Sequence, residues 1–268
     1  MKDGTIVHDR NLDFAFAPAM RNMTFIGKFY KGDEYLFDST MFAGYNGMHT
    51  GERPGAYSIS INERKPSWRT DIWRLVGNVA MIFAGYQQNT KLIRDTLIKC
   101  TSYECAYDAF QDTVIIAPCY YILAGTQENQ GVVLTRDRFA VAHKDQLSKD
   151  QWFVLQTNDD HWTGVCSARC AVAKQRMIDI GQENITPERI RNEILMQYPN
   201  MNEHGIYNAL MIPSQKEFNI KFMESDLPDP DMPTYSSTKR MEKYQSKNKQ
   251  HGCPWIRKAI DFFMKFME

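Results

Sequence analysis

Hydrophobic and polar positions divide the chain into stretches with the period of a strand and stretches with the period of a helix. Residues 56–62 alternate, which predicts a strand with one buried face. Between residues 68 and 110 the apolar positions recur every three or four residues, which predicts three helices, the third capped by Ser102. Further strands are predicted at residues 5–10, 23–30, 35–37, 114–117, 120–124, 131–136, 152–157, 206–212 and 218–222, and a helix from Thr186 to about Gln197.

This succession of elements predicts the layers of the fold. Strands, helices, strands, a helix and strands follow one another along the chain. A sheet that is apolar on one face must bury that face against another layer. We therefore expect an α+β protein in which two antiparallel sheets carry helices on their outer faces.

The first residues contain a hairpin-turn sequence that is followed by a predicted strand but preceded by none. Asp3-Gly4 is typical of a tight hairpin turn, because glycine tolerates the positive φ that such turns need. A predicted strand follows the turn, but only Met1 and Lys2 precede it. We therefore expect that the sequence begins inside a structural unit and that one strand is missing ahead of Asp3.

Composition narrows the function classes only mildly. The 268 residues are 43% hydrophobic and 24% charged, which is enough apolar material for one large buried core. Lys+Arg and Asp+Glu balance at 32 each, so net charge gives no reason to expect a nucleic-acid partner. No apolar run reaches the roughly 18 residues of a membrane span, and no signal-peptide pattern follows Met1. If the N-terminus is complete, the lack of both patterns indicates a cytosolic protein.

Cysteine and histidine spacing does not indicate a metal centre. The six cysteines show no CxxC pair, and the six histidines show no paired spacing either. We interpret the cysteines as ordinary half-buried thiols and expect no metal site. Two glycosylation sequons, at Asn22 and Asn184, are weak indications of a secretory route. The cysteines are Cys100, Cys105, Cys119, Cys166, Cys170 and Cys253.

The end of the chain differs from the rest. We assign residues 1–235 to one domain, because residues 236–252 are polar and basic like a solvated linker. Residues 255–268 combine aromatic side chains with lysine and arginine, which is compatible with an amphipathic helix. Such a helix would dock on the body of the protein, contact a lipid surface or belong to an incorrectly assigned terminus. Contact with a lipid surface is the least favoured of these.

Three polar clusters stand at the ends of predicted strands, where a rigid scaffold can aim side chains. They are residues 10–13, residues 62–64 and residues 157–162. Taken one at a time, each is more simply a surface ion pair or a turn.

Taken together, the clusters fit a known pattern. The chain resembles the acid ceramidase and N-acylethanolamine acid amidase family of N-terminal-nucleophile hydrolases, in order, from about Gly4 to Pro230. The stretches that carry the resemblance are Arg10-Asn11-Leu12-Asp13-Phe14, Phe42-Ala43-Gly44-Tyr45-Asn46-Gly47-Met48, Ile61-Asn62-Glu63-Arg64, Ala117-Pro118-Cys119-Tyr120-Tyr121, Val133-Leu134-Thr135-Arg136-Asp137-Arg138 and Gln156-Thr157-Asn158. The two stretches that contain Glu63 and Asp137 look closer to acid ceramidase than to N-acylethanolamine acid amidase.

The resemblance implies a four-layer αββα fold and a precursor that cuts itself, exposing a cysteine as the first residue of its β-subunit. That thiol attacks an amide carbonyl, and its own α-amine is the base. By resemblance, Arg10 and Asp13 position the cysteine, the backbone around Glu63 and the amide of Asn158 stabilise the oxyanion, and Arg169 supports the site. The nucleophile itself is expected upstream of Asp3, by about one strand of ~5–10 residues.

The sequence also departs from the family pattern. Cys100-Thr101-Ser102 imitates the start of the family's β-subunit, but it lies between two predicted helices and offers no free amine, so we exclude Cys100 as the nucleophile. Arg176 stands where the acid ceramidase pattern has an inter-subunit cysteine. Leu227 and Asp231 stand where that pattern has a cysteine pair, so those disulfides are not expected here.

The resemblance therefore implies a β-subunit that hydrolyses ceramide to a fatty acid and a sphingoid base, without a cofactor. Its partners would be the lipid substrate and an α-subunit from the same precursor, in a lysosome or the secretory pathway. Two alternatives remain open. One is an N-acylethanolamine amidase, and the other is a truncated, inactive homologue that binds lipid or a partner.

Overall fold

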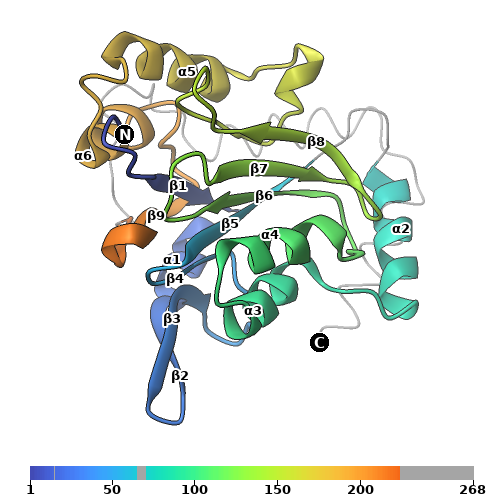
Figure 1. Ribbon diagram of the computed structural model, residues 1–268. Coiled ribbons are helices and arrows are strands. Elements are labelled where there is room, and N and C mark those ends of the chain that lie inside the picture. Colours follow the sequence, from blue (N-terminus) through green and yellow to red (C-terminus); the bar gives the residue numbers. More distant parts are fainter. Residues whose placement is uncertain (15, 65–70, 224–268) are drawn as a thin grey trace, which may run out of the picture. The chain divides into compact units, whose positions relative to one another are not determined.

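The structure, a computed structural model, describes residues 1–14, 16–64 and 71–223, whose strands form two antiparallel sheets (Figure 1). The larger sheet contains β2 (Thr24–Lys31), β3 (Glu34–Phe42), β4 (Thr50–Arg53), β5 (Tyr57–Glu63), β6 (Cys119–Ala124), β7 (Gly131–Arg136) and β8 (Val141–Gln146), in that order. The smaller sheet has the order β1 (His8–Asp13), β9 (Gly205–Ile212), β10 (Glu217–Phe222). The predicted linker and terminal helix, with Leu227 and Asp231, lie outside the described residues.

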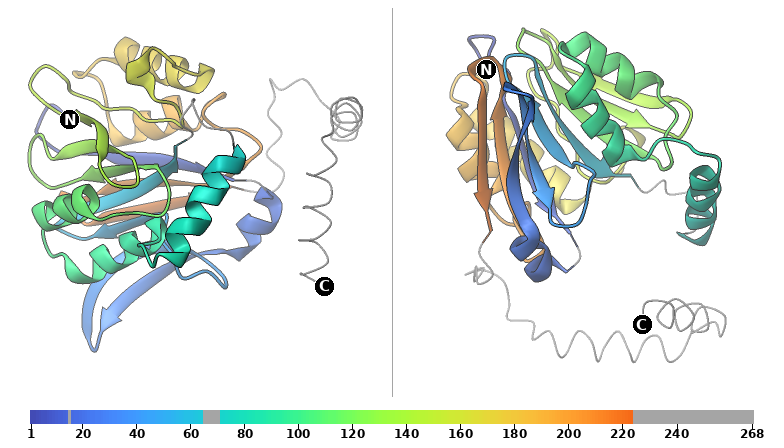
Figure 2. Two further views of the ribbon diagram at one scale, coloured as in Figure 1. Left: turned by 90° about the vertical axis from the view of Figure 1, so that its right-hand side faces the viewer. Right: turned by 90° about the horizontal axis from the view of Figure 1, so that it is seen from below.

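Helices cover the outer face of each sheet, as the view from below shows (Figure 2). Helices α3 (Asn89–Lys99) and α4 (Tyr103–Asp112) pack on the larger sheet. Helix α5 (Ala168–Ile180), the single turn α6 (Pro187–Arg189) and the π-helix η2 (Ile190–Leu195) lie on the side of the smaller sheet. The layers are therefore helix, sheet, sheet and helix, which confirms the predicted αββα architecture.

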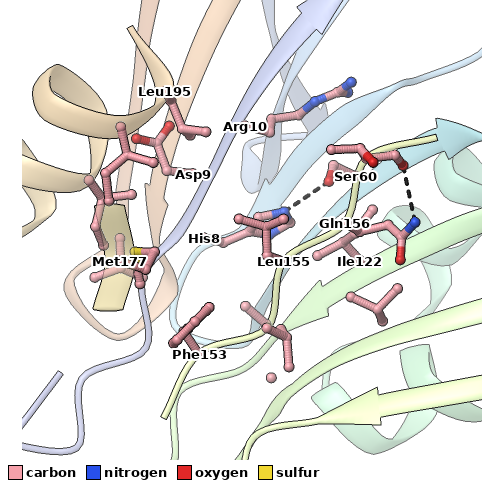
Figure 3. A pocket seen from close by; sticks show the side chains of 18 of the residues that line it. His8, Asp9, Arg10, Ser60, Ile122, Phe153, Leu155, Gln156, Met177 and Leu195 are labelled. Carbon is pink, nitrogen blue, oxygen red and sulfur yellow. Dashed lines mark hydrogen bonds between the residues drawn. The ribbon is translucent and has the colours of Figure 1, made fainter. Parts of the chain in front are cut away.

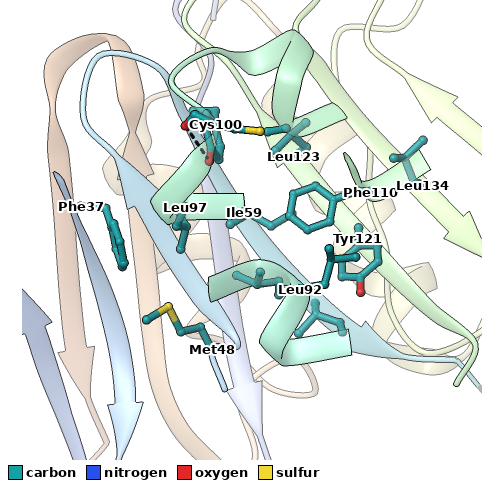
Figure 4. Close-up of a cluster of buried hydrophobic side chains, with 14 of the residues drawn as sticks. Phe37, Met48, Ile59, Leu92, Leu97, Cys100, Phe110, Tyr121, Leu123 and Leu134 are labelled. Atoms are coloured by element: carbon teal, nitrogen blue, oxygen red, sulfur yellow. Dashed lines mark hydrogen bonds between the residues drawn. The ribbon is translucent and has the colours of Figure 1, made fainter. Parts of the chain in front are cut away.

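The space between the larger sheet and its helices is filled by apolar side chains (Figure 4). On β5 the residues that face this layer are Tyr57, Ile59 and Ile61, and they meet Leu97 of α3. Phe110 of α4 is fully buried there, with its ring 4.6 Å from that of Tyr121. Successive side chains of a strand point to opposite faces, so the alternating pattern of residues 56–62 places the apolar residues of β5 on one face of the sheet, as predicted.

The space between the two sheets is partly polar. The hydroxyl of Tyr207 on β9 contacts the hydroxyls of Thr40 and Thr50 on the larger sheet, at 2.7 and 2.9 Å. The ring of His8 on β1 lies between the hydroxyls of Ser58 and Ser60 on β5, at 2.9 and 2.8 Å. The two sheets are thus joined by hydrogen bonds as well as by apolar packing.

Several predicted elements differ from the observed ones. Residues 152–157, a predicted strand, run without forming one, because within the described residues no neighbouring strand pairs with them. Residues 114–117 contribute only an isolated bridge between Ile115 and Gln87. The first strand begins at His8 and not at residue 5. Helix α5 and strand β8 were not predicted.

The cysteines also require a correction. The structure forms disulfides between Cys100 and Cys105 and between Cys166 and Cys170, and of the described cysteines only Cys119 keeps a thiol. Sequence spacing alone does not give disulfide connectivity, which is why half-buried thiols were the wrong interpretation. Among the described helices, none combines the length and the apolar character needed to cross a membrane.

Other helices agree better with the prediction. Helix α4 begins where predicted, with the Ser102 hydroxyl accepting a hydrogen bond from the Cys105 amide at 3.3 Å. Helix α2 (Asp71–Phe83) occupies the first of the three predicted helical segments. The predicted helix from Thr186 is present, but most of it is the π-helix η2. A short helix, α1 (Ala17–Met23), was not predicted.

Candidate active site

A pocket of about 230 Å³ runs along β1, with the extended segment of residues 152–157 on its other side (Figure 3). Near the start of β1 its walls are apolar and include Ile6, Val132 and Phe153. Near the end of β1 they are polar and include Asp13 and Asn158. In the described part of the chain β1 has a ladder only with β9, so its second edge is turned toward this pocket.

Arg10 enters the site from the middle of β1. Its guanidinium donates hydrogen bonds to the His49 carbonyl at 3.0 Å and to the Thr50 hydroxyl at 2.9 Å, and it reaches Asn62 Oδ1 at 3.4 Å. Burial lowers the pKa of this guanidinium, while the phenol of Tyr207 and the carboxylate of Asp13 act in the opposite direction. A buried arginine supplies a fixed positive charge beside the pocket.

A second arginine ties two of the predicted residues together. Arg169, in the first turn of α5, donates to Asp13 Oδ2 at 2.6 Å and to Asn158 Oδ1 at 2.8 Å. The amide nitrogen of Asn158 donates to the Glu63 carbonyl at 3.0 Å. Four of the predicted residues therefore form one connected chain of hydrogen bonds, in which Glu63 takes part through its backbone.

Asn62 links Arg10 to the same segment of chain. Its Oδ1 faces Arg10, and its amide nitrogen donates to the carbonyls of Gln156 and Thr157 at 3.2 and 3.3 Å. This side chain was grouped with Glu63 in the sequence, but no role was predicted for it. Asn62 could have been predicted as a site residue from its position at the polar end of the alternating strand.

The segment that carries Asn158 is anchored to the larger sheet by Asp160. The Arg64 guanidinium donates two hydrogen bonds of 2.8 Å to the Asp160 carboxylate, and the Tyr120 hydroxyl donates a third at 2.6 Å. Burial opposes ionisation of Asp160, but these hydrogen bonds outweigh it and lower the pKa of the carboxyl. A bidentate arginine–carboxylate pair fixes the orientation as well as the position of the carboxylate.

His8 was not predicted as a site residue, although its ring lines the pocket two residues before Arg10. Burial lowers the pKa of this imidazole to about 3, and the charge of Arg10 adds to the effect. The ring is therefore neutral at ordinary pH, with one nitrogen that donates and one that accepts. It can hold Ser58 and Ser60 in place, but a base this weak cannot take a proton from a nucleophile at neutral pH.

The arrangement suits stabilisation of a negative charge at the polar end of the pocket. The guanidinium groups of Arg10 and Arg169 and the side-chain amides of Asn62 and Asn158 lie there with the carboxylate of Asp13. No described cysteine lines the pocket. Cys119 is buried, which raises the pKa of its thiol to about 12, and the sulfur of Cys100 is bonded to Cys105, in keeping with its exclusion as a nucleophile. Among the described residues, no group of three or more histidine, cysteine or acidic side chains is arranged to hold a metal ion.

Comparisons with known proteins give the site a context. No family model matches the chain. It is 33% identical to the N-acylethanolamine-hydrolyzing acid amidase of Caenorhabditis elegans over 226 residues, 34% to that of Rattus norvegicus over 212, and 30% to the acid ceramidase of Homo sapiens over 249. These matches cover 83%, 78% and 85% of this chain, and the chain spans 62%, 57% and 61% of those proteins.

A solved structure extends the comparison to the fold. It is described as the Caenorhabditis elegans ortholog of N-acylethanolamine-hydrolyzing acid amidase, and it superimposes with a TM-score of 0.74 at 30% sequence identity. The match covers 83% of this chain and 96% of the solved chain. On this sequence identity and coverage, the chain belongs to the acid ceramidase and N-acylethanolamine acid amidase family and has the fold of an N-terminal-nucleophile hydrolase.

Proposed function

We propose that this protein is a cysteine amidohydrolase that cleaves ceramide, and that Arg10, Asp13, Glu63, Asn158 and Arg169 form its catalytic site. The observation that carries the proposal is the convergence of these residues at one end of an apolar pocket. A site with positive charge and amide donors at one end, and apolar walls at the other, suits the amide bond and the chain of a lipid amide.

The nucleophile in this proposal is a cysteine at the start of a strand that pairs with the second edge of β1. Two observations support this place for it. The edge of β1 faces the pocket, and residues 152–157 run extended along the other side without a ladder of their own. A strand added between them would form hydrogen bonds on both sides. Its first residue, the cysteine, would lie beside Asp13 and Asn158, where Asp13 orients the α-amine and Arg10 favours the thiolate.

The reaction then follows from these groups. The thiol passes its proton to its own α-amine, and the sulfur bonds to the carbonyl carbon of the substrate. The resulting oxyanion is stabilised by the amide of Asn158 and by the backbone around Glu63. The carbon–nitrogen bond breaks, and the leaving amine takes the proton from the α-amine. Water hydrolyses the thioester, which releases the fatty acid and restores the thiol.

The choice of amine is the part of the proposal that the relatives leave open, because both acid ceramidases and N-acylethanolamine-hydrolyzing acid amidases are among them. We favour ceramide because the runs Asn62-Glu63-Arg64 and Leu134-Thr135-Arg136-Asp137-Arg138 are closer to the acid ceramidase pattern. An N-acylethanolamine is the second candidate, since the solved structure that the chain resembles is that of an N-acylethanolamine-hydrolyzing acid amidase ortholog.

The compartment and the subunit partner are also proposals. We infer a lysosomal or secretory location, and the two disulfides support it, because such bonds persist in oxidising compartments. The α-subunit of the same precursor would complete the enzyme. The exposed side chain of Asn22, within a sequon, is open to glycosylation on that route.

The test is a pair of variants in the full-length precursor, assayed at acidic pH with detergent-dispersed ceramide. Asn158→Ala removes a proposed oxyanion donor, and kcat is expected to fall by about 10²–10³-fold with little change in melting temperature. Asn192→Ala, at an exposed asparagine of η2, is the matched control and should leave kcat unchanged. Equal losses in both variants would contradict the proposed role of Asn158.

Parallel assays identify the substrate. Ceramide and an N-acylethanolamine with the same acyl chain are compared by kcat/KM, and the larger value decides between the two candidates. Release of fatty acid from neither would overturn the proposal. Binding of ceramide without release, in a folded wild-type protein, would instead support the inactive lipid-binding homologue.

A further inference from the structure

The first turn of α5 holds a reactive-site arginine between two bonded cysteines. Arg169 is the second residue of the helix, and the disulfide between Cys166 and Cys170 spans the turn in which it lies. Cys170 is buried, while Cys166 is exposed at the end of a loop that contains Gly164 and the exposed Val165. The disulfide therefore joins a surface loop to the buried side of the helix.

Without this bond the first turn has few local reasons to be stable. Ser167 stands at the N-cap, yet its side chain accepts no hydrogen bond from the helix. The first turn carries no acidic residue, and the positive charge of Arg169 lies at the end of the helix where a negative charge is favoured. The loss of a capping hydrogen bond and an unfavourable charge both promote fraying of a helix end.

The contacts of Arg169 cannot hold the turn by themselves. The side chains of Arg169 and Asp13 are about one-third exposed, at 32% and 33%, and ion pairs that water reaches contribute little. Yet the same guanidinium must meet Asp13 and Asn158 at once, at 2.6 and 2.8 Å. Such two-sided contact needs a fixed backbone beneath it.

We propose that the Cys166–Cys170 disulfide is a positioning element that fixes the first turn of α5, so that Arg169 bridges Asp13 and Asn158. The inference rests on the proposed function for its catalytic consequence, but its structural part stands apart from it. The disulfide acts through Arg169 and touches no substrate.

The chain contains a matched control. The Cys100–Cys105 disulfide also bridges the start of a helix, α4, over a similar separation of 5 residues against 4. There the helix is capped by Ser102 and has Glu104 in its first turn, so its start is stabilised without the bond. None of the proposed catalytic residues lies on α4. Removal of this disulfide tests the general effect of losing a crosslink.

The experiment uses the full-length protein with both cysteines of one disulfide replaced by serine. For Cys166→Ser with Cys170→Ser, kcat is expected to fall by about 10- to 100-fold, the range for a misplaced catalytic group, while KM changes less. For Cys100→Ser with Cys105→Ser, kcat should stay within about threefold of wild type, because the loss of that crosslink displaces no catalytic group. Equal losses in the two variants would overturn the proposal.

A double-mutant comparison separates positioning from general destabilisation. In an Arg169→Met background, removal of the Cys166–Cys170 disulfide should cause no further loss of kcat, because the group that it positions is gone. If the double variant instead shows the product of the two separate fold-losses in kcat, the disulfide acts by a route other than Arg169 and the inference is overturned.

Hydrogen exchange tests the structural part without any activity. The Ala171 amide donates to the Ser167 carbonyl at 2.9 Å and reports directly on the first turn of α5. Its exchange should accelerate at least 10-fold in the Cys166→Ser, Cys170→Ser variant, and the Cys100→Ser, Cys105→Ser variant should leave it unchanged. Unchanged exchange overturns the inference. Accelerated exchange in a protein that cleaves neither lipid leaves the inference standing and overturns only the proposed function.

Discussion

The two faces of the larger sheet differ in what they bury. On β5, Tyr57, Ile59 and Ile61 face α3 and α4, and they lie in a layer built of apolar side chains. Ser58 and Ser60 alternate with them on the same strand and face β1, where both contact His8. The helix-facing layer is built of apolar side chains, whereas the sheet-facing layer combines an apolar cluster with polar groups that bond to the opposite sheet. The candidate site opens from the second layer.

The difference predicts that the two faces respond to different substitutions. Apolar deletions should act on the helix-facing layer through cavities, with effects that do not depend on pH. Changes in the sheet-facing layer should act through hydrogen bonds and ionisation, so pH should matter.

The largest expected effect lies in the helix-facing layer. Phe110→Ala removes a fully buried ring beside Tyr121, and the free energy of unfolding should fall by about 3–5 kcal/mol because a cavity remains. Urea unfolding measures this. Phe83→Ala is the control, since that ring is 87% exposed, and it should change stability by less than about 0.5 kcal/mol. A loss below about 1 kcal/mol for Phe110→Ala would mean that this layer is not tightly packed.

The next effect concerns a buried acid in the sheet-facing layer. Glu52 is fully buried, neither of its carboxyl oxygens has a hydrogen-bond partner, and it lies directly across from Asp38. Burial, with the nearby charges of Asp38 and Glu217, raises the pKa of Glu52 to about 9 from 4.5. Below pH 4.5 both folded and unfolded chains hold the proton; above it only the folded chain does. Stability should therefore fall as pH rises from about 4.5 to about 9.

Glu52→Gln removes this dependence while keeping the shape of the side chain. In the middle of the window the wild-type protein should lose about 1.4 kcal/mol more per pH unit than the variant. Unfolding is measured at several pH values, with Glu34→Gln, at an exposed position of β3, as the control. The same pH dependence in wild type and Glu52→Gln would show that Glu52 is ionised in the folded protein.

The smallest effect concerns the hydrogen bonds between the sheets. Ser60→Ala leaves one nitrogen of the neutral His8 ring without its partner, and the free energy of unfolding should fall by about 1 kcal/mol. Ser214→Ala, at an exposed serine, is the control and should have no measurable effect. Nitrogen-15 NMR should show that His8 stays neutral down to about pH 4, because the pKa of its ring is lowered to about 3. Titration of His8 near pH 6.5 would contradict the buried, neutral ring.

The sequence pattern predicted those helices and strands that depend mainly on interactions between residues close in sequence. The alternation at residues 56–62 became β5, and Ser102 caps α4 as expected. Helix α5 escaped prediction because the side chains that it buries include the small Cys170 and Ala173, which give a weak apolar pattern. Residues 152–157 have the composition of a strand, but a strand also needs a neighbour, and composition does not report neighbours.

The pattern of residues along the sequence predicted less of the candidate site than of the fold. Asp13 and Arg169 meet across 156 residues of sequence, a distance over which periodicity carries no information. Their grouping came from the family resemblance, and the observed hydrogen bonds are consistent with it. The disulfide beside Arg169 could not be predicted, since spacing does not fix connectivity. The roles of these residues stay predictions until the variants are measured.

The register of β1 has a consequence for how the protein is made. His8 pairs with Met211, so the strand that carries Arg10 and Asp13 cannot complete its ladder until β9 has been synthesised. At about 5–20 residues per second, the ribosome needs about 10–40 s to produce the intervening chain. Contacts so distant in sequence also form slowly once both partners exist. The residues of β1 that we propose as catalytic thus come into place late in folding, and the speed of translation through residues 13–205 affects how long an incomplete sheet must be kept from aggregating.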